Sequence, residues 1–474
     1  MTLAQIAGLG KELIVFLRLF VDCFVRQEGR DLLRVYVQGQ LSGLQRKTVE
    51  AIALQFGKAP RTLQRFLESI KWNEQRLRDR CQQIVAQEHA HAEAIGIIDE
   101  SGVAKSGKHT TGVSRQWLGS RGKVDNGVVG VHLSYSAPGF QCLLDSELFL
   151  PESWANDAER RKQNYVPEEI PFRTKQEIAM VLVDRALANG IQVRAWSYDT
   201  FYGRDGKFMD GLEERGQTFV GEIPANFHGW TQKPELRRKA PYLSRRPSCE
   251  VQNLVKYSPV FFEQSWERYR IKDTDKGPEV WEIKWSVLWR KGPDRRPGRQ
   301  HCLIVARNVL SGELKYFLAN CVPGRLGVTL RWLLRVAFGR CSVESCLREG
   351  KEELGLDHYQ VRGWRCIHRH LYVTQLSHLF CARIRQKYDD RSGDQLDRLT
   401  VEQVRSAMDT WLDTADMKPA ARQKRYEKEL DKQRYHQRRN EQARRSHTKT
   451  RIKKLQSDGV DPDRIKSCTP KPRE

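Results

Sequence analysis

The amino-acid sequence predicts an α/β protein with a mixed β-sheet core, an all-helical region before the core and a β-rich insertion within it. Up to residue 92, apolar residues recur at three- and four-residue spacing, and Pro60 is the only proline. From Ala94 the apolar period changes to two, which is typical of β-strands. The 474 residues, of which 39% are hydrophobic, are enough for about three domains of roughly 150 residues each. The expected organisation is a helical N-terminal domain over 1–92, a core over 93–224 and 321–415, a β-rich insertion over 225–320 and a basic C-terminal arm over 421–474.

Residues 48–70 have the rhythm of a helix-turn-helix within the helical N-terminal domain. The small Ala53 lets two helices approach closely, Gly57 permits a sharp turn, and Pro60 stands where a second helix begins. Such a unit suits DNA binding, but the plain packing of a helical hairpin gives the same pattern, so both interpretations stay open. The DNA-contacting residues that the unit predicts are Arg61 and Arg65.

The order of strands and helices predicts the architecture of the core. The expected elements are strands over 95–101, 128–135 and 140–150, a helix over 174–189, a strand over 191–199, a helix over 204–215 and a strand over 218–223. This order suits a ribonuclease-H-like mixed sheet, in which an antiparallel meander is followed by βα units. After the insertion, helices are expected over 326–338 and 342–354 and intermittently to about residue 415.

The insertion is predicted from strict alternation over residues 281–289. Trp281, Trp285 and Trp289 fall on one face of that strand, and we expect them to form one packed core face. A hairpin is expected to follow, with strands over 301–307 and 314–320.

The charge of the chain indicates a polyanionic partner. There are 82 Lys and Arg residues against 59 Asp and Glu, which gives a formal net charge of +23 and a pI near 9.6. Such an excess favours nucleic acid as the partner, although a solubilising surface is the alternative. Residues 421–474 hold 18 Lys and Arg against 8 Asp and Glu, with almost no aliphatic residue. We therefore expect a partly helical or disordered arm that buries no core and attracts phosphates or only solvates the protein.

Three classes of protein are excluded by what the sequence lacks. No stretch of 18 apolar residues and no secretory leader is found, so we expect a cytoplasmic protein without a membrane partner. The eleven cysteines include no CxxC pair and are expected to be reduced thiols. Residues 102–109 nearly match a phosphate-binding loop, but His109 stands where Ser or Thr should bind Mg²⁺, so no nucleotide cofactor is expected.

Three acids stand where a divalent cation would suit them. Asp99 lies in the first strand and Asp199 ends the strand over 191–199. Neighbouring strands of one sheet would bring them together, and a carboxylate beside apolar residues needs a partner such as a cation. A third acid, Glu344, shares a helix face with Arg348 and Lys351, which are four and seven residues later. Two Mg²⁺ ions held by such acids are what phosphodiester chemistry requires, and the neighbouring cations would hold the phosphate backbone.

Several long motifs, in the same order, resemble the DDE transposases of bacterial insertion sequences, particularly the insertion-sequence 701 family. The resemblance covers about residues 28 to 385. The motifs that carry it are IIDESGVAKSGKHTTGVSRQW (97–117), GKVDNGVVGV (122–131), LFLPESW (148–154), VPEEIPFRTK (166–175), YDTFYG (198–203) and ESCLREGKEELGLDHYQVRGW (344–364).

The resemblance implies roles for particular residues. It makes Asp99, Asp199 and Glu344 the catalytic, metal-binding triad, which would hold two Mg²⁺ ions with Mn²⁺ as a substitute. It places Arg340 and Lys351 in the signature around the third acid, where Ala337 replaces the usual tyrosine and so puts that tyrosine's role in doubt. The residues expected to contact DNA in or near the core are Lys105, Arg115, Arg340, Arg348 and Lys351. In relatives with such an insertion a tryptophan stacks on a flipped base, and the sequence does not choose between Trp230 and Trp266 for that role.

The function implied is cut-and-paste DNA transposition. The protein would cleave at the terminal inverted repeats of its element and join the 3′-hydroxyl ends to target DNA. A homodimer acting at the bacterial nucleoid is expected, because two element ends must be paired. The alternatives are an inactive or domesticated DNA-binding regulator and a Mg²⁺ nuclease without strand transfer.

Overall fold

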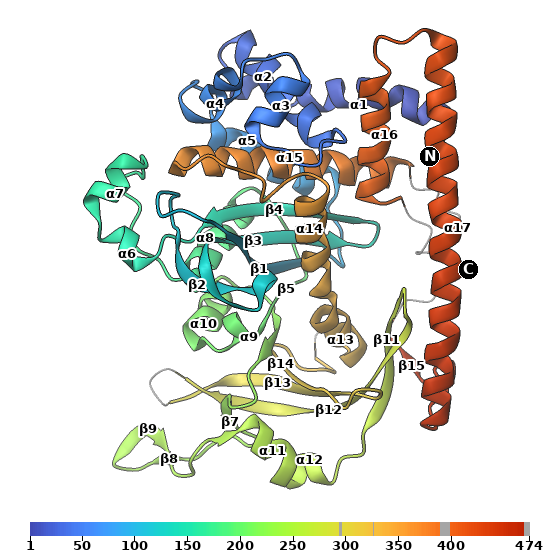
Figure 1. The fold of residues 1–474 in the computed structure, drawn as a ribbon. Coiled ribbons are helices and arrows are strands. Elements are labelled where there is room, and N and C mark those ends of the chain that lie inside the picture. Colours follow the sequence, from blue (N-terminus) through green and yellow to red (C-terminus); the bar gives the residue numbers. More distant parts are fainter. Residues whose placement is uncertain (293–295, 326, 389–398, 469–474) are drawn as a thin grey trace. The chain divides into compact units, whose positions relative to one another are not determined.

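The computed structural model describes residues 1–292, 296–325, 327–388 and 399–468, which divide between two units (Figure 1). The first unit contains residues 1–94, 98–193 and 342–437. The second contains residues 95–97 and 194–341 together with the chain from residue 438 onward. Among the described residues, no helix is both long and apolar enough to cross a bilayer.

The N-terminal part of the first unit is all helical, as the 3.6-residue period predicts. Its helices are α1 (Leu3–Arg18), α2 (Gln27–Leu41), α3 (Val49–Gln55), α4 (Pro60–Glu68) and α5 (Glu74–Glu88). Thr2 caps α1 in a capping box with Gln5, and Thr48 and Asn73 cap α3 and α5 through their side-chain oxygens. These caps satisfy backbone N–H groups that each helix would otherwise leave unpaired.

The turn between α3 and α4 has the geometry that the sequence predicts. Ala53 is fully buried, and the backbone N–H of Lys58 bonds to its carbonyl oxygen at 2.8 Å. Gly57 has a φ of +62°, in the left-handed region that an L side chain rarely adopts. Pro60 is the first residue of α4.

Replacing Gly57 with alanine is expected to lower the free energy of unfolding by about 1–2 kcal/mol. An added Cβ would meet no atom within 4 Å, so the cost is backbone strain alone. Gly107 is the matched control, since an added Cβ there also meets nothing, and its φ is not left-handed. Urea unfolding should separate the two variants; equal stabilities would contradict the assigned backbone strain.

In the first unit, β1 and β3 extend further than predicted, β4 ends two residues earlier than predicted, and there is one extra strand, β2. They are β1 (Ile95–Ala104), β2 (Ser114–Leu118), β3 (Lys123–Ala137) and β4 (Phe140–Leu148). The five-stranded sheet has the order β2-β3-β1-β5, and β4 also pairs with β3. The sequence analysis did not predict β2, because this short strand has a mostly polar sequence and is half exposed.

Helices cover this sheet within the first unit. The predicted helix over 174–189 is confirmed as α8 (Lys175–Ala188), which begins with a Thr174–Glu177 capping box and packs on β3 and β4. Two short helices, α6 (Glu152–Ala155) and α7 (Ala158–Gln163), precede it. The helices α14 (Cys341–Glu352), α15 (Trp364–Tyr388) and α16 (Val401–Asp413) follow the insertion, and α15 lies along β4 (Figure 1).

The second unit begins with β5 (Ala195–Tyr198), α9 (Thr200–Gly203), α10 (Gly206–Glu214) and β6 (Val220–Ile223). Its eight-stranded sheet has the order β10-β7-β12-β13-β14-β6, with β11 beside β12 and β15 beside β11. The strands are β7 (His228–Trp230), β10 (Cys249–Glu250), β11 (Glu267–Thr274), β12 (Gly277–Lys291), β13 (Pro297–Asn308), β14 (Leu314–Ala319) and β15 (Lys466–Ser467). A two-stranded sheet of β8 (Leu236–Arg237) and β9 (Ala240–Ser244) and the helices α11 (Val251–Tyr257), α12 (Pro259–Phe262) and α13 (Leu330–Gly339) complete it.

One strand joins a different sheet from the one predicted. The strand expected over 218–223 is present as β6, but it pairs with β14 of the eight-stranded sheet instead of extending the core sheet. Phe219, the residue before β6, forms an isolated parallel β-bridge with Trp196 of β5. The backbone groups of β6 therefore find their partners in a strand about 100 residues later, which local periodicity does not reveal.

The prediction that three tryptophans form one packed face of β12 is partly wrong. Trp281 is buried and packs on Phe338, but Trp285 and Trp289 are only half-buried. In that half of the strand the buried face carries Lys284 and Arg290 instead. These cations are tolerated because Lys284 Nζ donates to the carbonyl of Phe261 and Arg290 pairs with Asp210.

The C-terminal segment also differs from the free arm that its composition predicts. Residues Pro419–Ser457 form one 39-residue helix, α17. The buried side chains of Leu455, in the last turn of α17, and Val460, just after it, form a small core with Val280 of β12. β15 pairs in parallel with β11. A few well-placed apolar residues and strand hydrogen bonds thus anchor a segment that is otherwise highly charged.

Candidate active site

Asp99 lies in the middle of β1, directly after buried Ile97 and Ile98. Its carboxylate is half-buried, and Oδ1 accepts a hydrogen bond from the backbone N–H of Glu100 at 2.8 Å. Glu100 pairs with Lys175 at 2.7 Å, at the start of α8. Asp99 therefore follows a buried apolar run of β1, where a nearby positive charge favours the carboxylate.

Asp199 directly follows β5 and is the N-cap of α9. Its Oδ1 accepts hydrogen bonds from the backbone N–H groups of Phe201 at 3.0 Å and Tyr202 at 3.4 Å. These bonds fix the side-chain rotamer. In the sheet β5 is the neighbour of β1, which is the adjacency that the sequence predicts for the strands bearing the first two acids.

Glu344 is exposed in the first turn of α14. On the same helix Arg348 is exposed and Lys351 is half-buried. The pKa of Lys351 is lowered because burial disfavours its charged form, while Asp357 and Asp99 act in the opposite direction. The structure thus brings Lys351 into electrostatic contact with Asp99.

The six sequence-predicted residues of this set fall in both units. Asp99, Glu344, Arg348 and Lys351 belong to the first unit, while Asp199 and Arg340 belong to the second. Each acid is positioned by its own backbone environment: a strand interior, a helix N-cap and a first helical turn.

A small cavity of about 20 Å³ lies next to Asp99 along β1, and the sequence analysis missed it. Its lining includes Ser101, His132, Lys351 and Tyr359. Burial lowers the pKa of His132 to about 3, and its Nδ1 is 2.7 Å from the hydroxyl of Ser146. The imidazole is therefore neutral at physiological pH, and its contact with Ser146 links β3 to β4. The sign of this cavity in the sequence was a single histidine in an apolar strand.

Among the predicted DNA-contacting residues, Lys105 has a different environment from the one expected. Its ammonium donates to the carbonyl of Tyr359 at 2.8 Å and lies 3.7 Å from the centre of the same residue's ring. Burial lowers its pKa to about 8. The ammonium of Lys105 therefore binds Tyr359, in the segment that follows α14.

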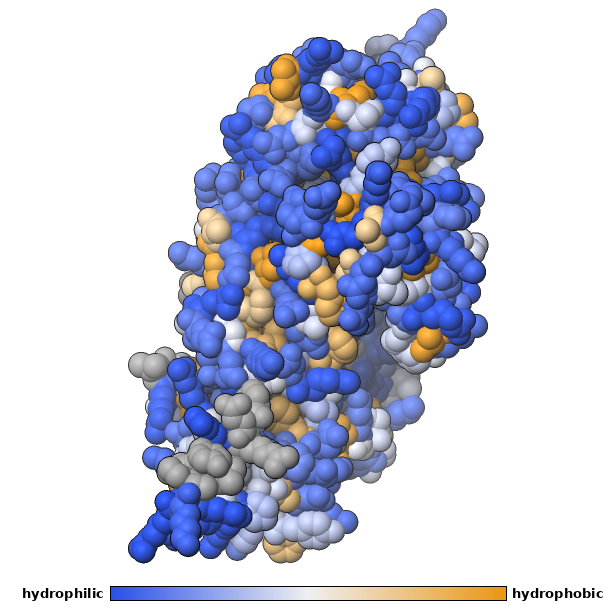
Figure 2. Space-filling view, turned by 90° about the vertical axis from the view of Figure 1, so that its left-hand side faces the viewer, coloured by the Kyte–Doolittle hydropathy of each residue, from blue (hydrophilic) through white to orange (hydrophobic). Residues whose placement is uncertain are grey.

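The other predicted cations of the first unit lie at the surface. Arg61 and Arg65 are exposed on α4, and Arg61 pairs with Glu68 at 2.8 Å. Arg115 is exposed on β2. Hydrophilic residues predominate on the face of the protein shown in Figure 2, in keeping with the net charge of +23.

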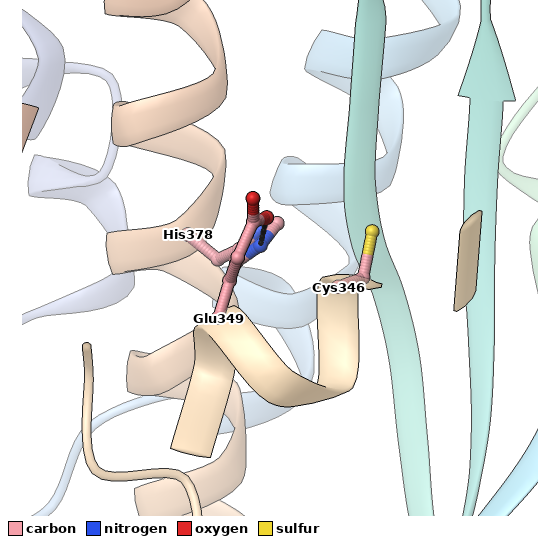
Figure 3. A group of neighbouring side chains, drawn as sticks. All are labelled: Cys346, Glu349 and His378. Atoms are coloured by element: carbon pink, nitrogen blue, oxygen red, sulfur yellow. Dashed lines mark ion pairs between the residues drawn. The ribbon is translucent and has the colours of Figure 1, made fainter. Parts of the chain in front are cut away.

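A cluster of Cys346, Glu349 and His378 has ligand atoms within 4.8 Å of one another, but its protonation does not suit a metal (Figure 3). Nδ1 of His378 accepts the backbone N–H of Leu143 at 3.3 Å, so the neutral ring carries its proton on Nε2. That Nε2 lies 3.4 Å from Glu349 Oε2. Neither ring nitrogen keeps a lone pair for a cation, and the cluster is a buried contact between α14 and α15.

A large part of this chain is similar in sequence to known proteins. Residues 19–273 match the family described as DDE superfamily endonuclease, a segment that includes Asp99 and Asp199 and ends before Glu344. Over 192 residues the chain is 30% identical to a probable transposase for insertion sequence element IS701 from Microchaete diplosiphon. That match covers 40% of this chain and 48% of the relative, so the chain spans about half the length of the relative it matches. Since the family match extends over more than half of its residues, the chain belongs to the DDE superfamily endonucleases.

Proposed function

We infer that this protein is a DNA transposase that cuts at the ends of an insertion sequence and joins the released 3′-hydroxyl ends to target DNA. The observation that carries this proposal is the family match, which extends through both Asp99 and Asp199. The similarity to a probable insertion-sequence transposase favours transposition over other endonuclease functions.

The proposed metal ligands are the carboxylates of Asp99, Asp199 and Glu344. Hard carboxylate oxygens suit Mg²⁺, and a half-buried carboxylate such as that of Asp99 gains from a bound cation. Two Mg²⁺ ions, or Mn²⁺ in their place, would activate the attacking oxygen and stabilise the leaving oxygen. The residues present therefore fit the ions that the family implies.

The protein's own groups would position the DNA for two successive displacements. In the first, a water oxygen bonds to the phosphorus at the element end, and the bond to the 3′ oxygen breaks, leaving a 3′-hydroxyl and a 5′-phosphate. In the second, the oxygen of that 3′-hydroxyl bonds to a phosphorus of target DNA, and the bond from that phosphorus to the target's own 3′ oxygen breaks, which leaves a new 3′-hydroxyl on the target strand. The side chains proposed to hold the phosphates near the acids are Arg340, Arg348 and Lys351. Lys105 is proposed to contact the DNA as well, while its ammonium also donates to the carbonyl of Tyr359.

The exposed cations of α4, Arg61 and Arg65, are proposed to contact the terminal inverted repeats. Pairing two element ends requires at least two active sites, so we propose a homodimer in the working complex. Acting on chromosomal DNA would place the protein at the bacterial nucleoid.

The test uses a labelled duplex that carries the element end and its flank, incubated with Mg²⁺ or with EDTA and a supercoiled target plasmid. A transposase should release a 3′-hydroxyl at the element boundary only with Mg²⁺ and then join the labelled strand to the plasmid. Cleavage without joining would favour the nuclease, and tight binding without cleavage would favour the DNA-binding regulator.

A further inference from the structure

An exposed tryptophan lies on the hairpin that β2 and β3 form. The side chain of Trp117 is 56% exposed, and Val124, directly opposite it on β3, is 49% exposed. Leaving this much apolar surface in water is unfavourable, at about 25 cal/mol for each Å². Adjacent exposed apolar side chains on a polar surface indicate a place where a partner binds.

The local packing holds Trp117 outward. The next residue, Leu118, is fully buried and packs so closely on Gly102 and Gly127 that an added Cβ at either would approach its side chain within 2.8 Å. Because successive side chains of a strand point to opposite faces, burial of Leu118 turns Trp117 toward solvent. The exposure of this ring is thus a consequence of the hairpin's own core.

The charges around Trp117 identify the chemistry of the partner. Arg115 lies two residues earlier on the same face, and Arg121 and Lys123 are exposed at the turn. Asp125 is the acid of the hairpin, and it lies 3.6 Å from Arg121. A flat aromatic ring with an exposed cation on the same face and two more at the neighbouring turn suits a polyanion with flat apolar rings, which is the description of DNA with an unpaired base.

The hairpin belongs to the same sheet as Asp99. The backbone N–H of Lys105, just beyond the end of β1, donates to the carbonyl oxygen of Asn126, which is two residues from Val124. Leu118, the residue next to Trp117, packs on Gly102, which is three residues after Asp99 in β1. At about 3.3 Å per strand residue, Gly102 is roughly 10 Å from Asp99. A contact at Trp117 would therefore touch DNA close to the scissile phosphate.

We propose that the β2–β3 hairpin binds DNA, with Trp117 stacked on the base of an unpaired nucleotide and with Arg115 and Lys123 on the flanking phosphates. The proposal rests on DNA being the substrate, as inferred above, and adds a stacking residue outside the acids and the insertion. An unpaired nucleotide near a cleaved element end is the ligand that such a contact would hold.

The test measures binding of the full-length Asp199→Asn protein in EDTA, so that no cleavage occurs. One probe is a 30-bp duplex with a five-nucleotide single-stranded extension carrying 2-aminopurine, and the other is the same duplex fully paired. Trp117→Ala should weaken binding to the extended probe by about 10-fold, within the range expected for one stacked base, and should leave the paired duplex nearly unchanged. Trp117→Phe should keep most of the affinity. Stacking should quench the fluorescence of 2-aminopurine when Trp117 is present but not in Trp117→Ala.

The charge contacts have their own readout. The Arg115→Gln/Lys123→Gln double variant should reduce the slope of log Kd against log salt by about 0.7–0.9 for each cation lost, while Trp117→Ala should leave the slope unchanged. Native-like affinity of Trp117→Ala for both probes would overturn the proposal. So would a loss of self-association in sedimentation with unchanged DNA binding, which would make the ring a contact between copies. Failure of the Asp199→Asn protein to bind any DNA would instead overturn the proposed function itself.

Discussion

Replacing Asp199 with asparagine is expected to reduce cleavage at the element end by about 10³-fold or more while leaving DNA binding within about two-fold. Asparagine is as good an N-cap as aspartate, so its side-chain oxygen can still accept the N–H groups of Phe201 and Tyr202. What the variant loses is the negative charge that the proposed metal site needs. Gel analysis of the labelled duplex with Mg²⁺ and a binding titration measure the two effects separately.

Asp205 provides the matched control in the same unit. It is also a helix N-cap, and its Oδ1 accepts the backbone N–H of Lys207 at 2.9 Å. Asp205→Asn should cleave like the unmodified protein, because that acid has no proposed role in the chemistry. Full cleavage by Asp199→Asn, or equal losses in both variants, would remove Asp199 from the triad.

Replacing Arg369 with methionine is expected to lower the free energy of unfolding of the first unit by about 3–5 kcal/mol. This side chain is 2% exposed on α15. Its Nη1 donates to the carbonyls that end α4, those of Phe66 at 3.1 Å, Leu67 at 3.3 Å and Ile70 at 2.9 Å. Its Nη2 reaches Glu74 at 3.0 Å. Methionine keeps the apolar stem but leaves the buried carbonyls without this donor and removes one of the two arginines that bind Glu74.

Arg365 is the control for this prediction, since it lies one turn earlier on α15 and binds the same Glu74 at 3.3 Å, but its side chain is 58% exposed. Arg365→Met should cost less than about 1 kcal/mol, because exposed ion pairs contribute little. Urea unfolding followed by circular dichroism measures both variants. If the two variants were equally stable, the buried bonds to the end of α4 would not hold the helical domain on α15 as assigned.

Local features of the sequence predicted most elements of the fold correctly. The helix α8 followed from its 3.6-residue period and the terminating Gly190, and the Thr174–Glu177 cap seen in the structure likewise acts within one turn. The turn at Gly57 followed from the need for a left-handed φ. β2 was missed because a short edge strand with a half-exposed, polar sequence has too weak a period to detect.

The candidate site was likewise predictable only in part from the sequence. The position of each acid relative to its own strand or helix could be read from neighbouring residues, and the order of motifs indicated the family to which the chain belongs. The internal binding of Lys105 to Tyr359 was not predictable, because 254 residues separate the two partners. The exposure of Trp117 depends likewise on the burial of Leu118 against residues of two other strands.

The sequence by itself determined the elements, the strand and helix positions of the acids, and the family. Only the tertiary structure decided that β6 pairs with β14, that Lys284 and Arg290 are on the buried side of β12, and that the charged C-terminal segment ends in a small core. The physical reason is the range of the forces involved. Periodicity and capping act between neighbours in the chain, whereas strand pairing and the burial of a charge depend on partners that only the folded chain brings together.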